Sequence, residues 1–73
     1  EVKVTVHEAH RLQELEEARG QLLRVFAKDG FCIAVFAWGC CSFPEEMEPQ
    51  LREMGGHEIA VLRLGKYHLR SVD

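Results

Sequence analysis

The sequence predicts an α+β domain built on a small antiparallel β-barrel. Apolar, strand-like runs cover most of residues 20–72, glycine-containing turns separate them, and one helical pattern lies between the third and fourth runs. A chain of 73 residues is long enough for a single domain. We therefore divide residues 1–73 into a leading strand and helix (residues 1–19) and a barrel (residues 20–73).

The leading segment combines two periods. Val2, Val4 and Val6 alternate with polar residues, which predicts a short strand with one apolar face. From residue 8 onward apolar residues recur at three-residue steps, which predicts an amphipathic helix. These residues are Ala9, Leu12, Leu15 and Ala18. Gly20 suits the left-handed position that ends a helix.

The first barrel strands are expected at residues 21–27 and 31–38, joined by the turn Lys28-Asp29-Gly30. Asp-Gly between two apolar runs is a strong hairpin signal. The second run is β-branched, aromatic and apolar on both faces, which predicts a central strand. Gly39 permits another turn, after which residues 40–43 return as a third strand.

A helix is expected to start at Pro44, because proline is favoured at the first helical position and glutamates crowd the next turns. Met47, Leu51 and Met54 share one face of this helix. Pro49 interrupts the pattern and predicts a kink or a restart there, because proline lacks an N–H. Gly55-Gly56 ends the helix.

Two further strands are expected at residues 57–64 and 67–72, joined by the turn Gly65-Lys66. Alternation places Tyr67 and Leu69 on one side of the last strand, opposite His68 and Arg70.

This element order resembles the OB-fold barrel over residues 20–72. The resemblance is carried by the order and by Lys28-Asp29-Gly30, Phe43-Pro44-Glu45-Glu46 and Gly55-Gly56-His57. It implies a groove over the second and third strands, edged by the turns at residues 28–30 and 65–66, that binds single-stranded nucleic acid. An SH3-like barrel gives nearly the same pattern, and the leading strand and helix depart from the five-strand OB pattern.

The charge is unevenly placed within a composition that is ordinary for globular proteins. Hydrophobic residues make up 47% and charged residues 29%, which excludes whole-chain disorder. The net charge is −3. Residues 7–19 carry four glutamates against two arginines, and residues 44–56 carry four glutamates against one arginine. Both expected helices are therefore acidic, which disfavours a polyanionic partner.

The cysteine pattern favours neither metal binding nor catalysis. Cys32, Cys40 and Cys41 lack the closely spaced pairs of a structural zinc site, and His7 and His10 straddle the expected strand-to-helix junction. No nucleophile signature is present, and the glutamates are typical of helix surfaces. We therefore expect no metal, no cofactor and no enzymatic activity. The odd number of thiols favours a reducing cytoplasmic setting, and no apolar run predicts a leader or a membrane span.

Seven barrel residues are candidate binding residues: Lys28, Phe36, Trp38, Arg63, Lys66, His68 and Arg70. Phe36 and Trp38 share one face of the expected strand 31–38. Such rings stack on bases in single-strand-binding barrels, while Lys and Arg contact the phosphates. Both rings are also typical of the core of a small domain.

We expect a non-enzymatic binding module that contacts a protein partner, a second copy included, or assembles subunits of a larger protein or complex. The edge of a partly open barrel offers unpaired backbone groups, and the leading helix offers Leu12 and Leu15 for docking. A single-stranded nucleic-acid-binding domain is the alternative. An exposed Trp38 beside a basic groove would favour nucleic acid, whereas an exposed apolar patch or a paired edge would favour a protein.

Overall fold

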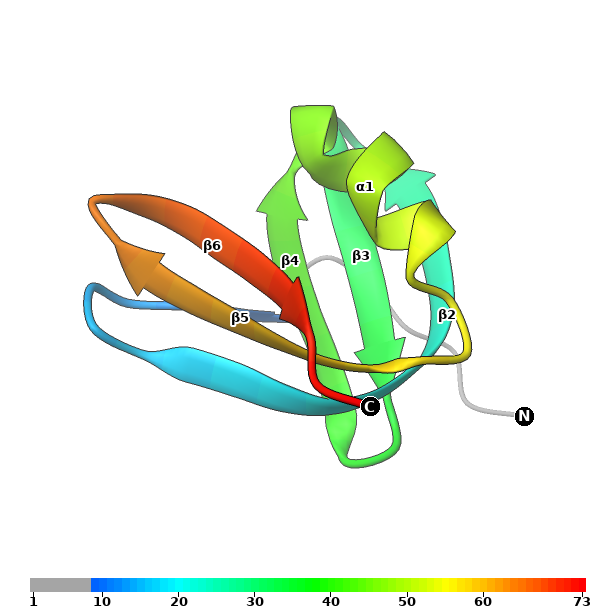
Figure 1. The fold of residues 1–73 in the computed structure, drawn as a ribbon. Coiled ribbons are helices and arrows are strands. Elements are labelled where there is room, and N and C mark those ends of the chain that lie inside the picture. The colour runs from blue at the N-terminus through cyan, green and yellow to red at the C-terminus, as the bar shows by residue number, and fades with distance from the viewer. Residues whose placement is uncertain (1–8) are drawn as a thin grey trace.

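The computed structural model describes residues 9–73, which form a small mixed-sheet half-barrel with one short helix (Figure 1). Its strands are β1 (His10–Arg11), β2 (Glu17–Lys28), β3 (Phe31–Phe36), β4 (Gly39–Pro44), β5 (Glu58–Leu64) and β6 (Lys66–Ser71). The strand order is β1-β4-β3-β2-β5-β6. Neighbours are antiparallel except β1 and β4, which run parallel. The expected leading strand at residues 2–7 lies outside the described residues.

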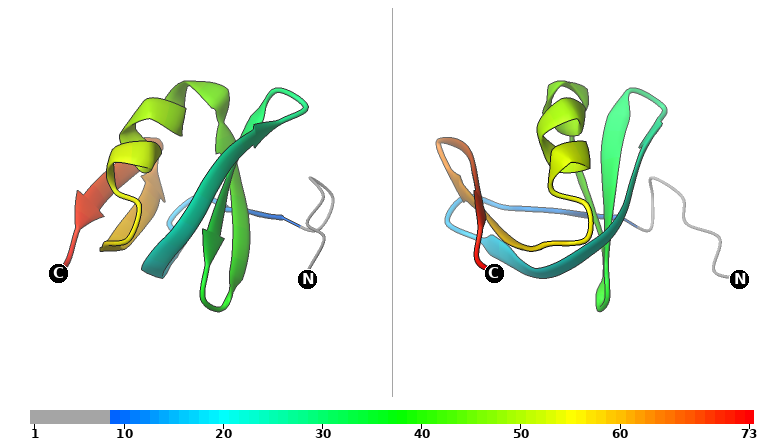
Figure 2. Two further views of the ribbon diagram at one scale, coloured as in Figure 1. Left: turned by 90° about the vertical axis from the view of Figure 1, so that its right-hand side faces the viewer. Right: turned by 45° about the vertical axis from the view of Figure 1, so that its right-hand side comes forward.

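The long strand β2 belongs to both halves of the half-barrel. Residues 17–21 pair with β5, and residues 22–28 pair with β3. The register shifts between Leu22 and Arg24, and such a bulge bends a strand. Figure 2 shows the β3–β4 and β5–β6 hairpins diverging from this strand, with the helical segment over the opening between them.

The expected helix at residues 8–18 is wrong. Residues 9–19 contain instead β1, a turn at Glu14 and Leu15, and the start of β2. The three-residue repeat does not mark one buried face, because Leu15 is 70% exposed while Leu12 and Ala18 are buried. Pairing with β5 provides backbone hydrogen bonds that outweigh helix propensity here. Leu12 is therefore a core residue rather than part of a docking helix.

Gly20 is likewise a mid-strand residue and ends no helix. The predicted hairpin at Lys28-Asp29-Gly30 is confirmed, since β2 and β3 are joined there. Asp29 has φ 53° and Gly30 has φ 81°, as a type I′ turn requires. The strand expected at residues 31–38 ends at Phe36, and Trp38 lies in the following turn.

The helical segment follows β4 and comprises a 3₁₀ turn, η1 (Glu45–Met47), and the helix α1 (Glu48–Glu53). Pro44 ends β4 and caps η1 rather than opening a helix. Pro49 sits in the first turn of α1, so the predicted restart at this proline is confirmed. Met47 and Leu51 are buried, so the expected apolar face packs against the sheet.

The core lies between the two hairpins and under the helical segment. It contains residues from β2, β3, β4, β5, the β1–β2 loop and the helical segment: Leu12, Ala18, Leu22, Cys32, Ala34, Phe36, Cys41, Phe43, Met47, Leu51, Ile59 and Val61. Tyr67 and Leu69 pack against this cluster from β6, while Lys66, His68 and Arg70 are exposed, as the alternation predicted.

Candidate functional site

Strand β6 forms one edge of the sheet, since among the described residues it pairs only with β5. Just beyond its end, the Val72 N–H donates to the Glu58 carbonyl oxygen at 2.9 Å. Backbone groups in an antiparallel strand point alternately toward and away from the partner strand. The backbone groups of Tyr67, Leu69 and Ser71 therefore point away from β5.

The hydrogen bonds of β5 confirm which residues of β6 direct their backbone groups away from β5. Arg63, which lies opposite Tyr67 in the register, donates its N–H to the Glu16 carbonyl at 3.0 Å and accepts from the Leu15 N–H at 2.6 Å. Its backbone groups are thus bonded on the side away from β6. Three N–H and C=O pairs of β6 consequently point to the side of the sheet where no strand of residues 9–73 pairs with it.

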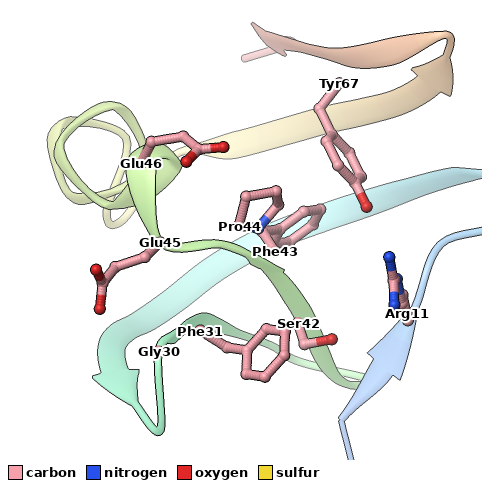
Figure 3. Close-up of a pocket in the computed structure, with 9 residues that line it drawn as sticks. All are labelled: Arg11, Gly30, Phe31, Ser42, Phe43, Pro44, Glu45, Glu46 and Tyr67. Atoms are coloured by element: carbon pink, nitrogen blue, oxygen red, sulfur yellow. The ribbon is translucent and has the colours of Figure 1, made fainter.

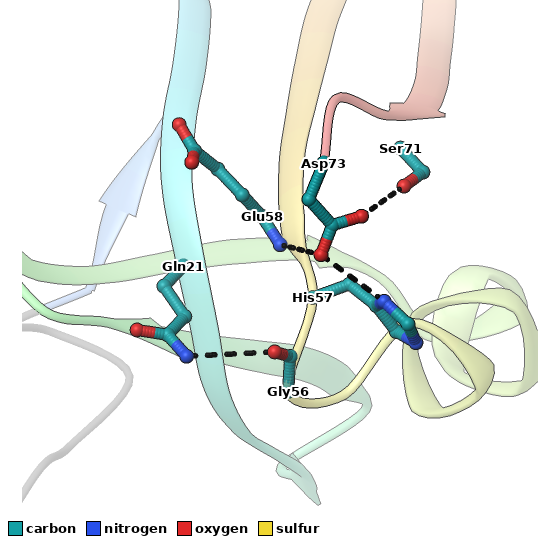
Figure 4. A network of polar contacts seen from close by, with 6 residues as sticks. All are labelled: Gln21, Gly56, His57, Glu58, Ser71 and Asp73. Carbon is teal, nitrogen blue, oxygen red and sulfur yellow. Dashed lines mark hydrogen bonds and ion pairs between the residues drawn. The ribbon is translucent and has the colours of Figure 1, made fainter.

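Both ends of the β5–β6 hairpin are held by side-chain carboxylates. At the turn, the Gly65 N–H donates to Glu14 Oε2 at 2.7 Å. At the other end, the Asp73 carboxylate accepts from the Ser71 hydroxyl at 2.8 Å and from the Glu58 N–H at 3.1 Å (Figure 4). The Ser71 hydroxyl and then the Glu58 N–H hold the pKa of Asp73 below its usual value. These contacts fix the geometry of the free edge.

Two grooves lie beside β6, and Tyr67 lines both of them. The first has a volume of about 440 Å³ and is lined by Arg11, Gly30, Phe31, Ser42, Phe43, Pro44, Glu45, Glu46 and Tyr67 (Figure 3). The second has a volume of about 410 Å³ and is lined by Gln50, Glu53, Met54, Lys66, Tyr67, His68 and Leu69. Both volumes are in the range of protein binding pockets. The Tyr67 ring meets the buried Phe43 ring edge to face, with centroids 5.4 Å apart.

Three polar groups converge in the first groove. Arg11 and Ser42 are register partners on adjacent parallel strands, so their side chains lie on the same face. Figure 3 shows the hydroxyls of Ser42 and Tyr67 directed toward the side where Arg11 stands. Glu45 and Glu46 form the opposite wall.

The two aromatic candidates, Phe36 and Trp38, pack against each other at the edge of the core. Phe36 is only 2% exposed, which makes it a core residue. Trp38 is 54% exposed, yet one ring face stacks on Phe36 at a centroid distance of 4.9 Å and an interplanar angle of 4°. Its indole N–H donates to the Arg19 carbonyl at 2.8 Å. The bond thus provides a partner for the Arg19 carbonyl, which lies in the part of β2 that pairs with β5 and not with β3.

The basic candidates are not gathered around Trp38. Arg63 points inward, donating to the Leu12 carbonyl at 2.7 Å and lying 5.5 Å over the Tyr67 ring. Lys28 stands at the β2–β3 turn, at the far end of β3 from Trp38. Lys66, His68 and Arg70 form a row on the exposed face of β6. The nucleic-acid groove that the resemblance implied is therefore not assembled from these residues.

Sequence reasoning missed Arg11 and Ser42 as site residues. The sequence places Arg11 in an expected helix that does not form, and no feature of the sequence sets Ser42 apart. For Tyr67 the signal was available, because the alternation along residues 66–71 already placed it on the inner side of an edge strand.

Cys32 and Cys41 are buried in the core. Burial raises the pKa values of the Cys32 and Cys41 thiols to about 11, with smaller contributions from neighbouring acidic groups. No three His, Cys, Asp or Glu side chains in this part of the chain gather closely enough to hold a metal ion.

Comparisons with protein-family models, curated proteins and solved structures find no match to this chain. Over the described residues, the structure contains no helix with the length and apolar character needed to span a bilayer.

Proposed function

We propose that this domain is a non-enzymatic protein-binding module that takes an extended segment of a partner protein as an additional strand beside β6. The observation that carries the proposal is the row of outward N–H and C=O pairs at Tyr67, Leu69 and Ser71. Strand addition uses such groups for affinity and uses pockets for alternate side chains for specificity. Here the grooves on either side of Tyr67 supply the pockets.

The hydrogen bonds at the two ends of the β5–β6 hairpin support the proposal. Contacts from Glu14 and Asp73 hold the two ends of the hairpin, so little ordering of β6 is needed when a segment binds. The side chains of an added strand alternate between two environments. Those on the inner side meet Tyr67 and Leu69, and those on the outer side meet Lys66, His68 and Arg70. A segment with alternating apolar and acidic residues fits this edge.

The charges on β6 favour a different protein over a second copy as the partner. In an antiparallel pairing of two β6 strands, residues with outward backbone groups face one another. The even-numbered residues then also face one another. Lys66 and Arg70 of both copies would stand on one face, and like charges directly opposite are destabilising.

Single-stranded nucleic acid is the second candidate. It is favoured by the 54% exposure of Trp38 and by the row of Lys66, His68 and Arg70. The separation of Trp38 from this row and the acidic helical segment weigh against it.

Selection of a displayed library of random decapeptides, with free carboxyl termini, on the whole chain tests the proposal. We expect enriched peptides to lose about tenfold in affinity for Ser71→Pro, because proline removes one outward N–H. Ser71→Ala is the matched control, since both variants lose the Ser71–Asp73 hydrogen bond. No enrichment, or equal affinity for the two variants, would overturn strand addition at β6.

A second measurement on the unmodified chain remains available if Ser71→Pro unfolds. Binding of an enriched peptide is expected to slow hydrogen exchange at the amides of Tyr67, Leu69 and Ser71. Unchanged exchange at all three amides in the peptide complex would contradict the proposal.

A further inference from the structure

We infer that the first groove, beside Tyr67, binds the carboxyl terminus of the partner segment. This inference rests on the proposed addition of a strand to β6. The groove holds one guanidinium and two hydroxyls, from Arg11, Ser42 and Tyr67.

The polar atoms of these three side chains make no hydrogen bond or ion pair with another group of residues 9–73. Ser42 exposes only 6% of its surface, and its hydroxyl makes no hydrogen bond to another group of residues 9–73. Within the same residues, the Arg11 guanidinium makes no ion pair and the Tyr67 hydroxyl no hydrogen bond. No side-chain N or O atom of the described residues is both buried and unbonded, so the Ser42 hydroxyl is accessible from the groove and open to a ligand oxygen there.

The donor set selects a single anionic group. Guanidinium and hydroxyl groups donate hydrogen bonds, and a guanidinium favours the planar carboxylate. Glu45 and Glu46 on the opposite wall disfavour a ligand with several negative charges. The groove is therefore matched to one carboxylate and poorly matched to a chain of phosphates.

The position of Tyr67 indicates which end of the bound segment lies at the groove. Tyr67 carries the first outward backbone pair of β6 and also lines the groove. A strand that adds antiparallel to β6 runs in the opposite direction, so its carboxyl-terminal end lies beside residues 66–67. Its terminal carboxylate then reaches the groove, while the rest of the segment follows β6 toward Ser71.

The test uses one enriched decapeptide synthesised as the free acid and as the carboxyl-terminal amide. For the unmodified chain, we expect the amide to bind at least about tenfold more weakly. For Arg11→Gln, the acid and the amide should bind equally. Glu45→Gln, on the opposite wall, is the matched control and should keep the preference for the acid.

A third peptide, the amide with aspartate as its last residue, separates a terminal carboxylate from a side-chain carboxylate. Recovery of the affinity of the free acid would overturn the assignment to the terminus. Equal binding of acid and amide would overturn the carboxylate site. If Ser71→Pro still weakened binding in that case, strand addition at β6 would stand without it. Peptides indifferent to both Ser71→Pro and amidation would overturn both proposals.

Discussion

Trp38 lies so close over Gly20 that a Cβ atom on Gly20 would be 2.6 Å from the indole Nε1. The same nitrogen donates the hydrogen bond to the Arg19 carbonyl. The absence of a side chain at Gly20 thus lets the indole approach the backbone of β2.

Gly20→Ala is therefore expected to displace the indole and to lower the free energy of unfolding by about 1–2 kcal/mol, as an overpacked contact does. Denaturant unfolding measures the loss, and the fluorescence of Trp38 should shift to the red. Gly55→Ala is the control, because its Cβ would meet the Arg52 carbonyl oxygen at an ordinary 3.5 Å. A Gly20→Ala variant as stable as the unmodified chain would contradict this packing.

Trp38→Ala separates the structural role of the ring from a binding role. We expect a loss of about 1–3 kcal/mol of stability, from the Phe36 stack and the indole hydrogen bond. Titration with oligothymidylate at low salt should show no binding by the unmodified chain. Salt-sensitive micromolar binding that the folded variant loses would make nucleic acid the leading function.

The β2–β3 turn gives a backbone prediction. Gly30→Val should cost about 1 kcal/mol or more, because a β-branched residue resists the positive φ of this position. Asp29→Asn is the control, since asparagine adopts the left-handed region readily. A denaturation midpoint for Gly30→Val that matches that of the control would refute the type I′ assignment.

The strands of the barrel were predictable because their signals are local. Asp29-Gly30 sets a hairpin by its own conformational preference, and the alternation of residues 66–71 marks the inner face of β6. The helical segment was predictable for the same reason, since the glutamates after Pro44 and the spacing of Met47 and Leu51 are local signals.

The sequence could not reveal that the expected leading helix is wrong, because the strand pairing that replaces it involves residues far along the chain. Residues 17–21 pair with β5, whose partners are 37–45 positions further along the chain. The candidate site has the same character. Arg11 and Ser42 become neighbours only through the parallel pairing of β1 with β4, and a short strand of two residues leaves no periodic signal.

Glu16 links acid stability to the β1–β2 loop. Its carboxylate accepts from the Gln13 N–H at 2.8 Å and lies 2.8 Å from His10 Nε2. The Gln13 N–H and then His10 hold the pKa of Glu16 below its usual value of 4.5. A lowered carboxyl pKa contributes stability that is present above the unfolded pKa and lost as the pH falls through the folded pKa.

Glu16→Gln should therefore flatten the fall in melting temperature below about pH 4.5. Glu17→Gln removes the same charge from the next residue without touching this hydrogen bond, and serves as the control. If the melting temperatures of Glu16→Gln and the unmodified chain fell equally at acid pH, the contact of Glu16 with the loop would not be formed.

The buried thiols should resist alkylation in the folded chain. With pKa values of about 11, Cys32 and Cys41 remain protonated at neutral pH, and the thiolate is the reactive form. Mass spectrometry of a Cys40→Ser variant treated with iodoacetamide should show no adduct before denaturation and two after it. An adduct on the folded variant would contradict the burial of these side chains.

The sharing of β2 between the two hairpins has a consequence for the order of folding. The β2–β3 pairing closes a very short loop, whereas the β2–β5 pairing closes one of about forty residues and carries the larger entropic cost. We therefore expect the β2–β3–β4 meander to be structured in the rate-limiting transition state, with β5 and β6 docking after it. Substitutions in the meander should then slow refolding, while those in β6 should mainly accelerate unfolding.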